Sequence, residues 1–494
     1  MTFNQDSLKN DRSQDWRVEL RNIIKNKDRL KLQRVRMNEV DAEKRVQSYV
    51  EVNSGLTAEQ AVNEAQRCLD CANPTCISGC PVEINIPAFI KNIERKDFLE
   101  AAKTLKLTSS LPAVCGRVCP QEKQCEANCF YTIKMKTEPV AIGFLERFAA
   151  DYERESNQIS VPATATANGI KVACIGSGPA SLTCAGELAK LGYSVTVFEA
   201  LHEIGGVLKY GIPEFRLPNK IVDVEIDVLK QMGVQFETNF IVGKTATIND
   251  LREEGYVAFF AGSGAGLPRF MEIPGENYIG ILSSNEYLTR VNLMNAASPY
   301  TDTPVICGLN VAVIGGGNTA MDSVRTAKRL GAKRAMIVYR RSMDEMPARI
   351  EEIHHAQEEG IEFLTLTNPI EYFSDEKGCL KQMRVQKMGL GEPDASGRRR
   401  PVEIEGSEYL IDVDTVIVSV GVSPNPIIPN SLPNLKMTRW KTIEVNEETL
   451  QSSIPDIFAG GDIVRGGATV ILAMGDGRKA AASMNNYIQN IKTK

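Results

Sequence analysis

The sequence predicts an α/β protein with two Rossmann-like dinucleotide-binding domains that follow an α-helical domain rich in cysteine. Residues 170–199 and 309–341 each run strand, glycine turn, helix and strand, which is the order of a dinucleotide-binding unit. Eight of the 12 cysteines lie between Cys68 and Cys129. A chain of 494 residues has room for roughly two to four domains.

The composition is that of an ordinary globular protein and excludes two broad classes. A net charge of −5 excludes a strongly basic nucleic-acid binder. No apolar run reaches the ~20 residues that cross a bilayer, and the N-terminal residues MTFNQDSLKNDRSQDW lack the apolar core of a signal peptide. We therefore expect a cytoplasmic protein that binds neither nucleic acid nor membrane.

Residues 1–50 form a polar N-terminal arm that we expect to be helical. Ten basic and four acidic residues lie between Lys9 and Arg36. Such a segment is typical of a solvated helix or a loose tail, and a docking helix is the alternative. After the arm, Thr57 and Gln60 predict a capping box at the start of the helix that leads into the first cysteine.

The clustered cysteines form two groups with short spacings. The groups are Cys68, Cys71, Cys76 and Cys80, which precedes a proline, and then Cys115, Cys119, Cys125 and Cys129. Zinc is one candidate, but structural zinc sites usually use two separated Cys-x2–4-Cys pairs. A run of four cysteines that ends in Cys-Pro is closer to bacterial ferredoxins. The pattern therefore favours two [4Fe–4S] clusters over zinc or a single cluster.

The ferredoxin pattern also indicates how the thiols are shared. In ferredoxins, three cysteines of a run bind one cluster and the Cys-Pro cysteine binds the other. Cys68, Cys71 and Cys76 would bind one cluster with a thiol of the second group, and Cys80 would join the other cluster. Spacing alone leaves open which of the eight thiols is spare.

The first glycine turn predicts an FAD site. A strand from Val172 leads into a turn and a helix N-terminus, which together can hold a pyrophosphate. The turn consists of Gly176, Gly178, Pro179, Ala180 and Ser181. The next strand ends in Glu199, where an acid can accept hydrogen bonds from ribose hydroxyls. Gly205 with Gly206, and Gly461 with Asp462 after a late strand, fit a longer ligand and favour FAD over a nicotinamide cofactor.

The second glycine turn predicts an NADPH site. Its residues are Gly315, Gly316, Gly317, Asn318 and Thr319, and Gly421 ends a further strand of the same region. The strand after this turn ends in Arg340 and Arg341 instead of an acid. A guanidinium pair can bind a 2′-phosphate that an acid would repel, so we expect NADPH in preference to NADH. The alternative is that these arginines lie at the end of a strand and bind no ligand.

These sites on one chain imply an order of electron flow. Hydride would pass from NADPH to FAD, and FAD would release single electrons to the clusters, so no catalytic side chain is required. The flavin-binding half contains no Cys-x-x-Cys pair, which argues against disulfide reduction.

The motifs together resemble one known family. They are residues 67–71 (RCLDC), 111–121 (LPAVCGRVCPQ), 210–218 (YGIPEFRLP), 273–276 (IPGE) and 315–322 (GGGNTAMD). The chain resembles the small subunit of NADPH-dependent glutamate synthase from about residue 56 to 488. Related proteins are the N-terminal half of dihydropyrimidine dehydrogenase and the large subunit of NADH-dependent ferredoxin:NADP transhydrogenase.

The resemblance implies roles for particular residues. One [4Fe–4S] cluster would be held by Cys68, Cys71, Cys76 and Cys129, and the other by Cys80, Cys119, Cys125 and Glu146. Cys115 would then be spare. Arg216 would contact FAD, and Asp462 with Thr469 would form the flavin-facing C-terminal turn.

The resemblance also implies a domain order and a function. The expected domains are an arm (1–50), an iron–sulfur domain (51–165), an FAD domain (166–300 and 405–494) and an inserted NADPH domain (301–404). The chain would pass electrons to a larger glutamate-forming subunit. One alternative is a transhydrogenase subunit or related diaphorase that serves another acceptor, such as a ferredoxin-type protein. Another is a non-catalytic scaffold or oxygen sensor.

Overall fold

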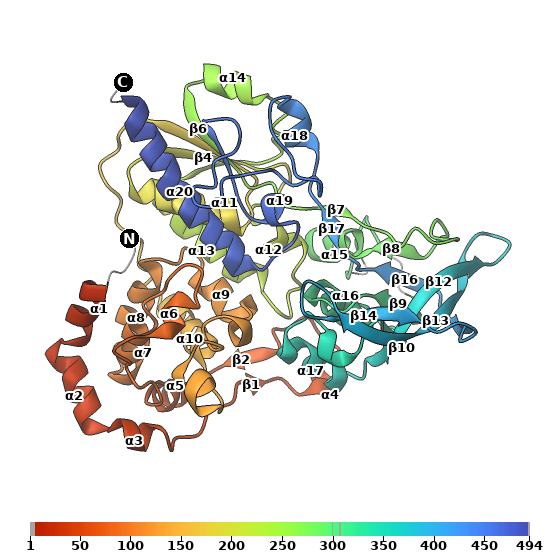
Figure 1. Ribbon diagram of the computed structural model, residues 1–494, viewed down its shortest axis with the longest axis horizontal. Helices are drawn as coiled ribbons and strands as arrows, with labels where there is room; N and C mark the ends of the chain where they lie inside the picture. The colour runs from red at the N-terminus through yellow and green to blue at the C-terminus, as the bar shows by residue number, and fades with distance from the viewer. Residues whose placement is uncertain (1–4, 299, 306–307, 493–494) are drawn as a thin grey trace.

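The computed structural model describes residues 5–298, 300–305 and 308–492. Two five-stranded parallel sheets lie beside a helical domain, which confirms the predicted α/β class (Figure 1). Among the described helices, none is long and apolar enough to cross a membrane.

The helical domain carries both cysteine groups. Its helices are α5 (Ala58–Ala65), α6 (Thr75–Ser78), α7 (Ile86–Glu94), α8 (Phe98–Lys106), α9 (Pro112–Val118) and α10 (Ile142–Glu155). The predicted capping box of α5 is confirmed, because Thr57 accepts from the Gln60 backbone N–H and Gln60 accepts from that of Thr57. The core of this domain is continuous with that of the first sheet.

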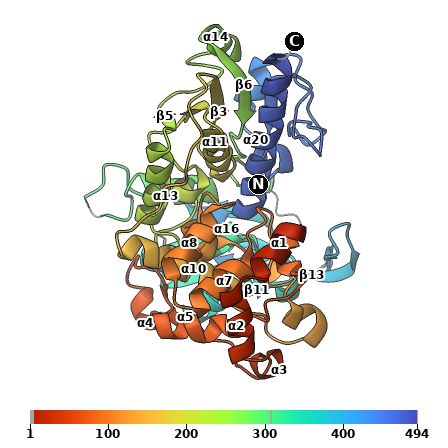
Figure 2. The same ribbon diagram turned by 90° about the vertical axis from the view of Figure 1, so that its left-hand side faces the viewer.

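The N-terminal arm packs along the helical domain, so its interpretation as a loose or solvated segment is wrong. It forms α1 (Gln5–Arg12), α2 (Asp15–Ile23), α3 (Asn26–Arg29), β1 (Asn38–Glu39) and α4 (Ala42–Arg45), and β1 pairs with β2 (Asn53–Gly55). Figure 2 shows α1 and α2 in front of α7 and α8. Arg17, Arg29 and Arg45 of the arm are buried in ion pairs, and these acidic partners explain why so basic a segment folds onto the protein.

The first sheet has the strand order β18-β6-β3-β4-β5. The strands are β3 (Lys171–Ile175), β4 (Ser194–Phe198), β5 (Gln235–Glu237), β6 (Tyr256–Ala261) and β18 (Ile457–Ala459). β18 comes from the C-terminal part of the chain and pairs with β6, so the sheet is assembled from two distant segments. Helices α11 (Pro179–Lys190), α13 (Asn219–Gln231) and α20 (Val470–Lys492) lie beside it.

The second sheet has the order β11-β10-β9-β16-β8. Its strands are β8 (Ile281–Ser283), β9 (Asn310–Ile314), β10 (Arg334–Tyr339), β11 (Glu362–Thr365) and β16 (Thr415–Val418). The second unit extends beyond the expected range 301–404, because β8 and β16 both belong to its sheet. β16 pairs with β9 and β8 pairs with β16, and without them the backbone groups of β9 on that side would lack hydrogen bonds. The helices α15 (Ser284–Leu293), α16 (Asn318–Arg329) and α17 (Ile350–Glu358) belong to the same unit.

Two smaller antiparallel elements complete the second unit. β12 (Thr367–Ser374), β13 (Leu380–Pro393), β14 (Arg399–Glu403) and β15 (Tyr409–Asp412) form a four-stranded sheet. β7 (Leu267–Pro268) pairs with β17 (Val422–Ser423), and these two strands lie where the chain passes between the units.

Helix α20 packs closely on α11, and a glycine makes this approach possible. A Cβ at Gly477 would lie 2.1 Å from the carbonyl oxygen of Ala180, the second residue of α11. On its other side, a Cβ at Gly475 would lie 3.0 Å from Pro81. The helix therefore contacts the first glycine turn and the first cysteine group at the same level.

Exchange of Gly477 for Ala should destabilise the protein, although Ala is the better helix former. The added methyl group must push α20 away from α11, and overpacking of this kind costs about 1–3 kcal/mol. The midpoint of thermal unfolding measures the effect. Gly389→Ala is the control, because its Cβ would lie 3.8 Å from the nearest atom; equal midpoints for the two variants would contradict the packing argument.

Candidate functional site: two cysteine groups and two glycine turns

Four of the cysteines in the helical domain lie close enough to act on one another. Cys68 follows α5, Cys71 and Cys76 follow it closely in the chain, and Cys129 comes from the second group. Burial is the largest cause that raises the pKa of Cys76 well above its ordinary value, and the neighbouring thiols raise it further. The same causes raise the pKa of Cys71 to about 12. Thiols placed so close together become thiolates only beside a strong positive charge, which is what a metal cluster supplies.

A second set of groups lines a small cavity. Cys80, Cys119, Cys125 and Glu146 contribute to its wall together with the apolar Ile84, Phe89, Ile142 and Ile471. Ile471 belongs to α20, which lies beside the first sheet, so this helix closes one side of the cavity. Apart from Gln124, the rest of the wall is apolar, and three thiols with one carboxyl group form a donor set that fits an iron–sulfur cluster.

Glu146 is the member of this wall that sequence spacing alone could not identify. It lies on α10 and is buried, and its Oε1 accepts no hydrogen bond from the described residues. Burial, with a smaller contribution from Glu225, raises its pKa to about 8. A buried carboxyl oxygen without a partner is costly, which is consistent with a ligand for a cation.

Cys115 has a different environment. It is buried but does not line the cavity, and its Sγ lies 3.3 Å from the sulfur of Met474 on α20. Gln121 donates from Nε2 to the Cys115 carbonyl oxygen at 3.0 Å. These contacts place Cys115 in the packing between α9 and α20.

The first glycine turn has the geometry that a phosphate-binding loop needs. Gly178 is the N-cap of α11, and a Cβ there would meet no atom within 4 Å, so the space above the helix N-terminus is open. Gly176 has φ +89° and lies against the backbone of Gly262, which leaves no room for a side chain. Pro179, Ala180 and Ser181 form the first turn of α11.

Glu199 directly follows β4, and its carboxylate holds the first glycine turn through hydrogen bonds. Its Oε2 accepts from the Ser177 backbone N–H (2.8 Å) and hydroxyl (2.6 Å), and its Oε1 accepts from the Leu201 N–H (2.8 Å). Ser177 Oγ in turn accepts from the Gly205 N–H at 2.9 Å. One lone pair of Glu199 Oε1 remains for a further donor.

The late strand returns to this turn, as the family resemblance implies. Gly206 lies against Gly178, and a Cβ on Gly461 would lie 3.1 Å from that of Ala180. Asp462 begins the short helix α19 (Asp462–Arg465), and its Oδ1 accepts from the Ala468 N–H at 2.8 Å. Desolvation, with Asp462 and Glu199, raises the pKa of Tyr210 to about 12, so these three residues converge. Thr469 directly precedes α20, and its hydroxyl accepts from the Leu472 N–H.

Asp476 is a residue of this region that sequence analysis missed. It is buried on α20, and its carboxylate accepts from the Gly461 N–H at 2.9 Å and from Arg465. It thereby holds the loop between β18 and α19 in place. The signal in the sequence is a charged residue between two glycines, Gly475 and Gly477, within an apolar helix.

The second glycine turn repeats the geometry of the first. Gly317 is the N-cap of α16, and a Cβ there would meet open space. Gly315 (φ +140°) lies against the Ser419 carbonyl oxygen, and Gly316 lies against the Tyr339 ring. Asn318 and Thr319 begin α16, and Asn318 Oδ1 accepts from the Arg349 N–H at 2.8 Å. Gly421 has φ +118°, and its carbonyl oxygen accepts from the Arg269 N–H.

The two arginines after β10 are not equivalent. Arg340 is exposed, and no ion pair to it is formed by the described residues. Arg341 is buried, pairs with Asp394 at 2.7 Å, and donates from Nε to the Arg399 carbonyl oxygen at 2.8 Å. The hairpin between β13 and β14 therefore already neutralises one member of the predicted pair.

Arg216 contacts two acids of the second dinucleotide unit. Its guanidinium group donates twice to the Asp322 carboxylate on α16, at 2.7 and 2.8 Å, and lies 3.1 Å from Glu352 on α17. The structure therefore brings Arg216 to the second dinucleotide unit, where two buried acids compensate its charge.

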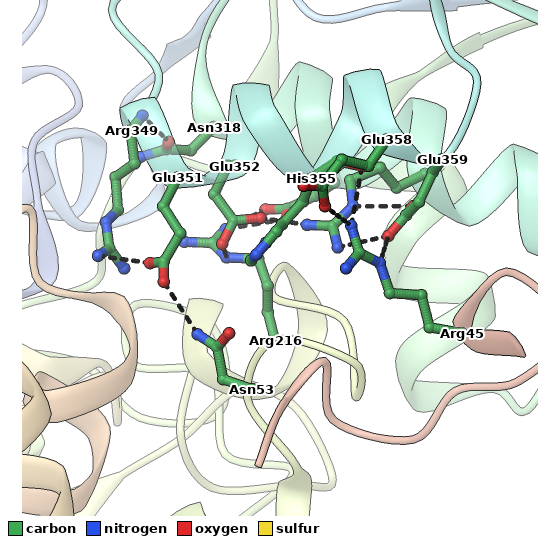
Figure 3. A network of polar contacts seen from close by, with 12 residues as sticks. Arg45, Asn53, Arg216, Asn318, Arg349, Glu351, Glu352, His355, Glu358 and Glu359 are labelled. Atoms are coloured by element: carbon green, nitrogen blue, oxygen red, sulfur yellow. Dashed lines mark hydrogen bonds and ion pairs between the residues drawn. The ribbon is translucent and has the colours of Figure 1, made fainter. Parts of the chain in front are cut away.

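Arg216 is one end of a buried network that joins the units (Figure 3). Glu352 also pairs with Arg325, and Arg325 pairs with Glu359, which accepts from Arg45 of the arm at 2.9 Å. The neighbouring group of Glu39, Glu351 and His355 offers three ligand atoms within 4.8 Å of one another. Arg45 lies 3.6 Å from Glu39 and Arg349 lies 2.8 Å from Glu351, so arginines already compensate these carboxylates.

Two family descriptions match the chain. Residues 45–158 match dihydropyrimidine dehydrogenase domain II, 4Fe-4S cluster, and residues 170–477 match the pyridine nucleotide-disulphide oxidoreductases. The matches follow the division between the helical domain and the two sheets.

Full-length relatives extend this likeness. The chain is 36% identical to the glutamate synthase [NADPH] small chain of Azospirillum brasilense, over 90% of this chain and 93% of that one. It is 36% identical to that of Escherichia coli K12, over 89% and 94%. It is 38% identical to the NADP(+)-dependent formate dehydrogenase subunit beta of Moorella thermoacetica, over 84% of this chain but 60% of that one.

Solved structures share the fold of the two-sheet part. FprA of Mycobacterium tuberculosis, solved in complex with NADPH, superposes with a TM-score of 0.55 at 20% identity, over 66% of this chain and 86% of FprA. The likeness concerns the fold alone.

Exchange of Arg216 for Ala should destabilise the protein strongly. It leaves Asp322 buried without its arginine, and the loss of one partner of a buried ion pair costs about 3–5 kcal/mol. Arg334→Ala is the control, because Arg334 pairs with Glu362 at the surface and such pairs contribute about 0–1 kcal/mol. Calorimetric unfolding of both variants measures the difference, and a small effect of Arg216→Ala would contradict the network.

Proposed function

Because this chain belongs to the family of glutamate synthase small chains, we propose that it is the electron-input subunit of an NADPH-dependent redox complex. It takes electrons from NADPH and passes them through FAD and two [4Fe–4S] clusters to a larger partner subunit. When bound, these groups supply the hydride and single-electron chemistry. The protein binds them, orients them and keeps water away.

One observation carries this proposal: the cavity of Cys80, Cys119, Cys125 and Glu146 is closed by α20, the helix that follows the flavin-side turn. Ile471 of α20 lines the cavity, and Thr469 stands two residues earlier. Arg478 of the same helix donates to the Val82 carbonyl oxygen, close to Cys80. A single rigid helix thus connects the FAD turn and a cluster cavity.

We assign the FAD site to the first glycine turn. The open N-terminus of α11 at Gly178 favours the negative charge of a pyrophosphate. The free lone pair of Glu199 Oε1 suits a ribose hydroxyl, and Asp462 suits the ribityl side of the cofactor. Arg216 is not included, because its ion pairs are with Asp322 and Glu352 of the second dinucleotide unit.

We assign the NADPH site to the second glycine turn. The open N-terminus of α16 at Gly317 receives the pyrophosphate, and Asn318 and Thr319 stand beside it. Arg340 is the group for the 2′-phosphate, since its charge is uncompensated, whereas Arg341 holds the hairpin through Asp394.

We assign one cluster to Cys68, Cys71, Cys76 and Cys129, and the other to Cys80, Cys119, Cys125 and Glu146. Support comes from the burial and mutual proximity of each set, and from the unpartnered Oε1 of Glu146. Cys115 stays outside both sets.

The partner and the compartment are also part of the proposal. We propose a glutamate synthase large subunit as the acceptor and the cytoplasm as the location. The 11 described cysteines form no disulfide, as is usual in reducing compartments. Anaerobic addition of NADPH should bleach the flavin and iron–sulfur absorbance, and NADPH should then drive glutamate formation once the large subunit is added. An unbleached spectrum would overturn the proposal.

A second candidate is an NADPH-linked subunit that serves another acceptor or donor. The similar identity to the Moorella formate dehydrogenase subunit beta favours it, and a ferredoxin:NADP transhydrogenase subunit belongs to the same class. Bleaching by NADPH without glutamate formation, together with reduction of a ferredoxin-type protein, would select this candidate.

Exchange of Arg340 for Ser should weaken NADPH binding but leave NADH binding nearly unchanged. The lost charge-assisted hydrogen bond to the 2′-phosphate corresponds to a rise in the KM for NADPH of about 10- to 100-fold. Steady-state kinetics with both nucleotides measure the change. Arg334→Ser, at the opposite end of β10, is the matched control; an unchanged NADPH preference in Arg340→Ser would contradict the assignment.

Exchange of Glu146 for Ala should remove one cluster, whereas exchange of Cys115 for Ala should remove neither. Loss of a ligand from a buried cluster site should lower the iron content of the protein by about half. Iron and sulfide analysis of protein purified without oxygen measures this. Full iron content in Glu146→Ala, or a loss in Cys115→Ala, would contradict the ligand assignment.

A further inference from the structure

The N-terminal arm reaches acids that stand next to cysteines in the chain. Asp70 lies between Cys68 and Cys71 and is completely buried, with φ +51°. Glu126 directly follows Cys125 and is also buried. Arg34 of the arm pairs with Glu126 at 2.9 Å. The arm therefore acts on the surroundings of both cysteine groups.

Asp70 receives the densest set of contacts. Its Oδ1 accepts from Arg17 and its Oδ2 from Arg21, both on α2. Its backbone carbonyl oxygen accepts from Arg12 Nε of α1 at 2.7 Å. The loop between Cys68 and Cys71 is thus held from one side by three arginines of the arm.

The arginines are themselves fixed. Arg17 is 2% exposed and also donates to Asp11 at 2.7 Å, and Asp11 accepts from Asn85 at 3.0 Å. Arg21 donates to the Arg12 carbonyl oxygen at 3.0 Å. Buried charges in fixed positions are screened little by salt, so their field acts on whatever the neighbouring thiols hold.

The field of Asp70 reaches the thiols on both sides. Asp70 is the chain neighbour of Cys71 and lies two residues from Cys68, so its buried negative charge acts on both. The buried Lys91 brings a positive charge to the same region: its Nζ donates to the Cys68 carbonyl oxygen at 2.6 Å and also pairs with Glu94. A group at these thiols thus lies between fixed charges of both signs.

We propose that Asp70, held by Arg17 and Arg21 of the arm, is a positioning residue that sets the reduction potential of the cluster bound by Cys68, Cys71, Cys76 and Cys129. This inference rests on the ligand set of the proposed function. Reduction adds one negative charge to the cluster. A buried carboxylate disfavours that charge and the two arginines favour it, so the balance between them fixes the potential.

Variants of opposite charge test the inference in the full-length protein with its flavin and clusters. Asp70→Asn removes a negative charge and should raise the potential, whereas Arg17→Gln or Arg21→Gln should lower it. We expect changes of roughly three- to tenfold in the equilibrium constant for reduction, where tenfold is about 59 mV for one electron. A redox titration followed by electron paramagnetic resonance measures the potential of the signal that is absent from Cys76→Ser.

Lys31→Gln is the matched control for the arginine variants. It also removes one positive charge from the arm, but Lys31 is exposed and pairs only with the half-exposed Asp28 among the residues described. The reduction potential of the cluster in Lys31→Gln should stay at the wild-type value. Arg21→Gln serves where Arg17→Gln does not fold, because Arg21 is partly exposed.

The outcomes separate this inference from the proposed function. Shifts of opposite sign for Asp70→Asn and Arg21→Gln, with none for Lys31→Gln, support the role of Asp70. Shifts of the same sign, no shifts, or loss of the cluster from both variants would overturn it, since a merely structural contact predicts no reversal of sign. Wild-type protein without iron or sulfide would instead overturn the proposed function.

Discussion

The close packing of α20 on α11 determines how the first glycine turn and the cavity of the second cysteine set lie relative to each other. Gly477 allows the two helices to approach until α20 touches the Ala180 carbonyl oxygen of the first glycine turn. From that position Asp476 holds the Gly461 loop, Ile471 closes the cavity of the second cysteine set, and Met474 contacts Cys115. A shift of this helix would move the flavin turn and the cavity together, so a rigid contact here keeps their separation constant.

Buried ion pairs hold the dinucleotide units and the arm in fixed positions, as α20 holds the flavin turn. Arg216 joins the first dinucleotide unit to Asp322 of the second, and Arg45 joins the arm to Glu359. Replacing such pairs with apolar residues often costs little stability, so their value lies in the geometry that they select. Each pair has its partners in different units, which fixes the orientation of the nicotinamide nucleotide unit relative to the flavin unit and the arm.

The sequence predicts local geometry well, because a glycine turn, a helix N-terminus and a capping box each depend on residues only a few positions apart. Gly178, Gly317 and the Thr57 capping box therefore lie as expected. The return of Asp462 to the first turn came from family resemblance, since β18 reaches β6 across nearly two hundred residues. The arm could not be interpreted correctly, because its charges have partners that composition does not reveal.

The arginines show most clearly what cannot be predicted from the sequence, namely whether a charged side chain is available to a ligand. An arginine in a motif is counted as free to bind a ligand, yet its availability depends on acids that lie far away in the chain. Arg216 meets Asp322 across 106 residues, Arg341 meets Asp394 across 53, and Arg17 meets Asp70 across 53. Arg340 differs from Arg341 by one position, yet it is exposed and none of the described residues forms an ion pair with it. The hairpin that pairs with Arg341 through Asp394 therefore leaves its neighbour as the group available to a phosphate.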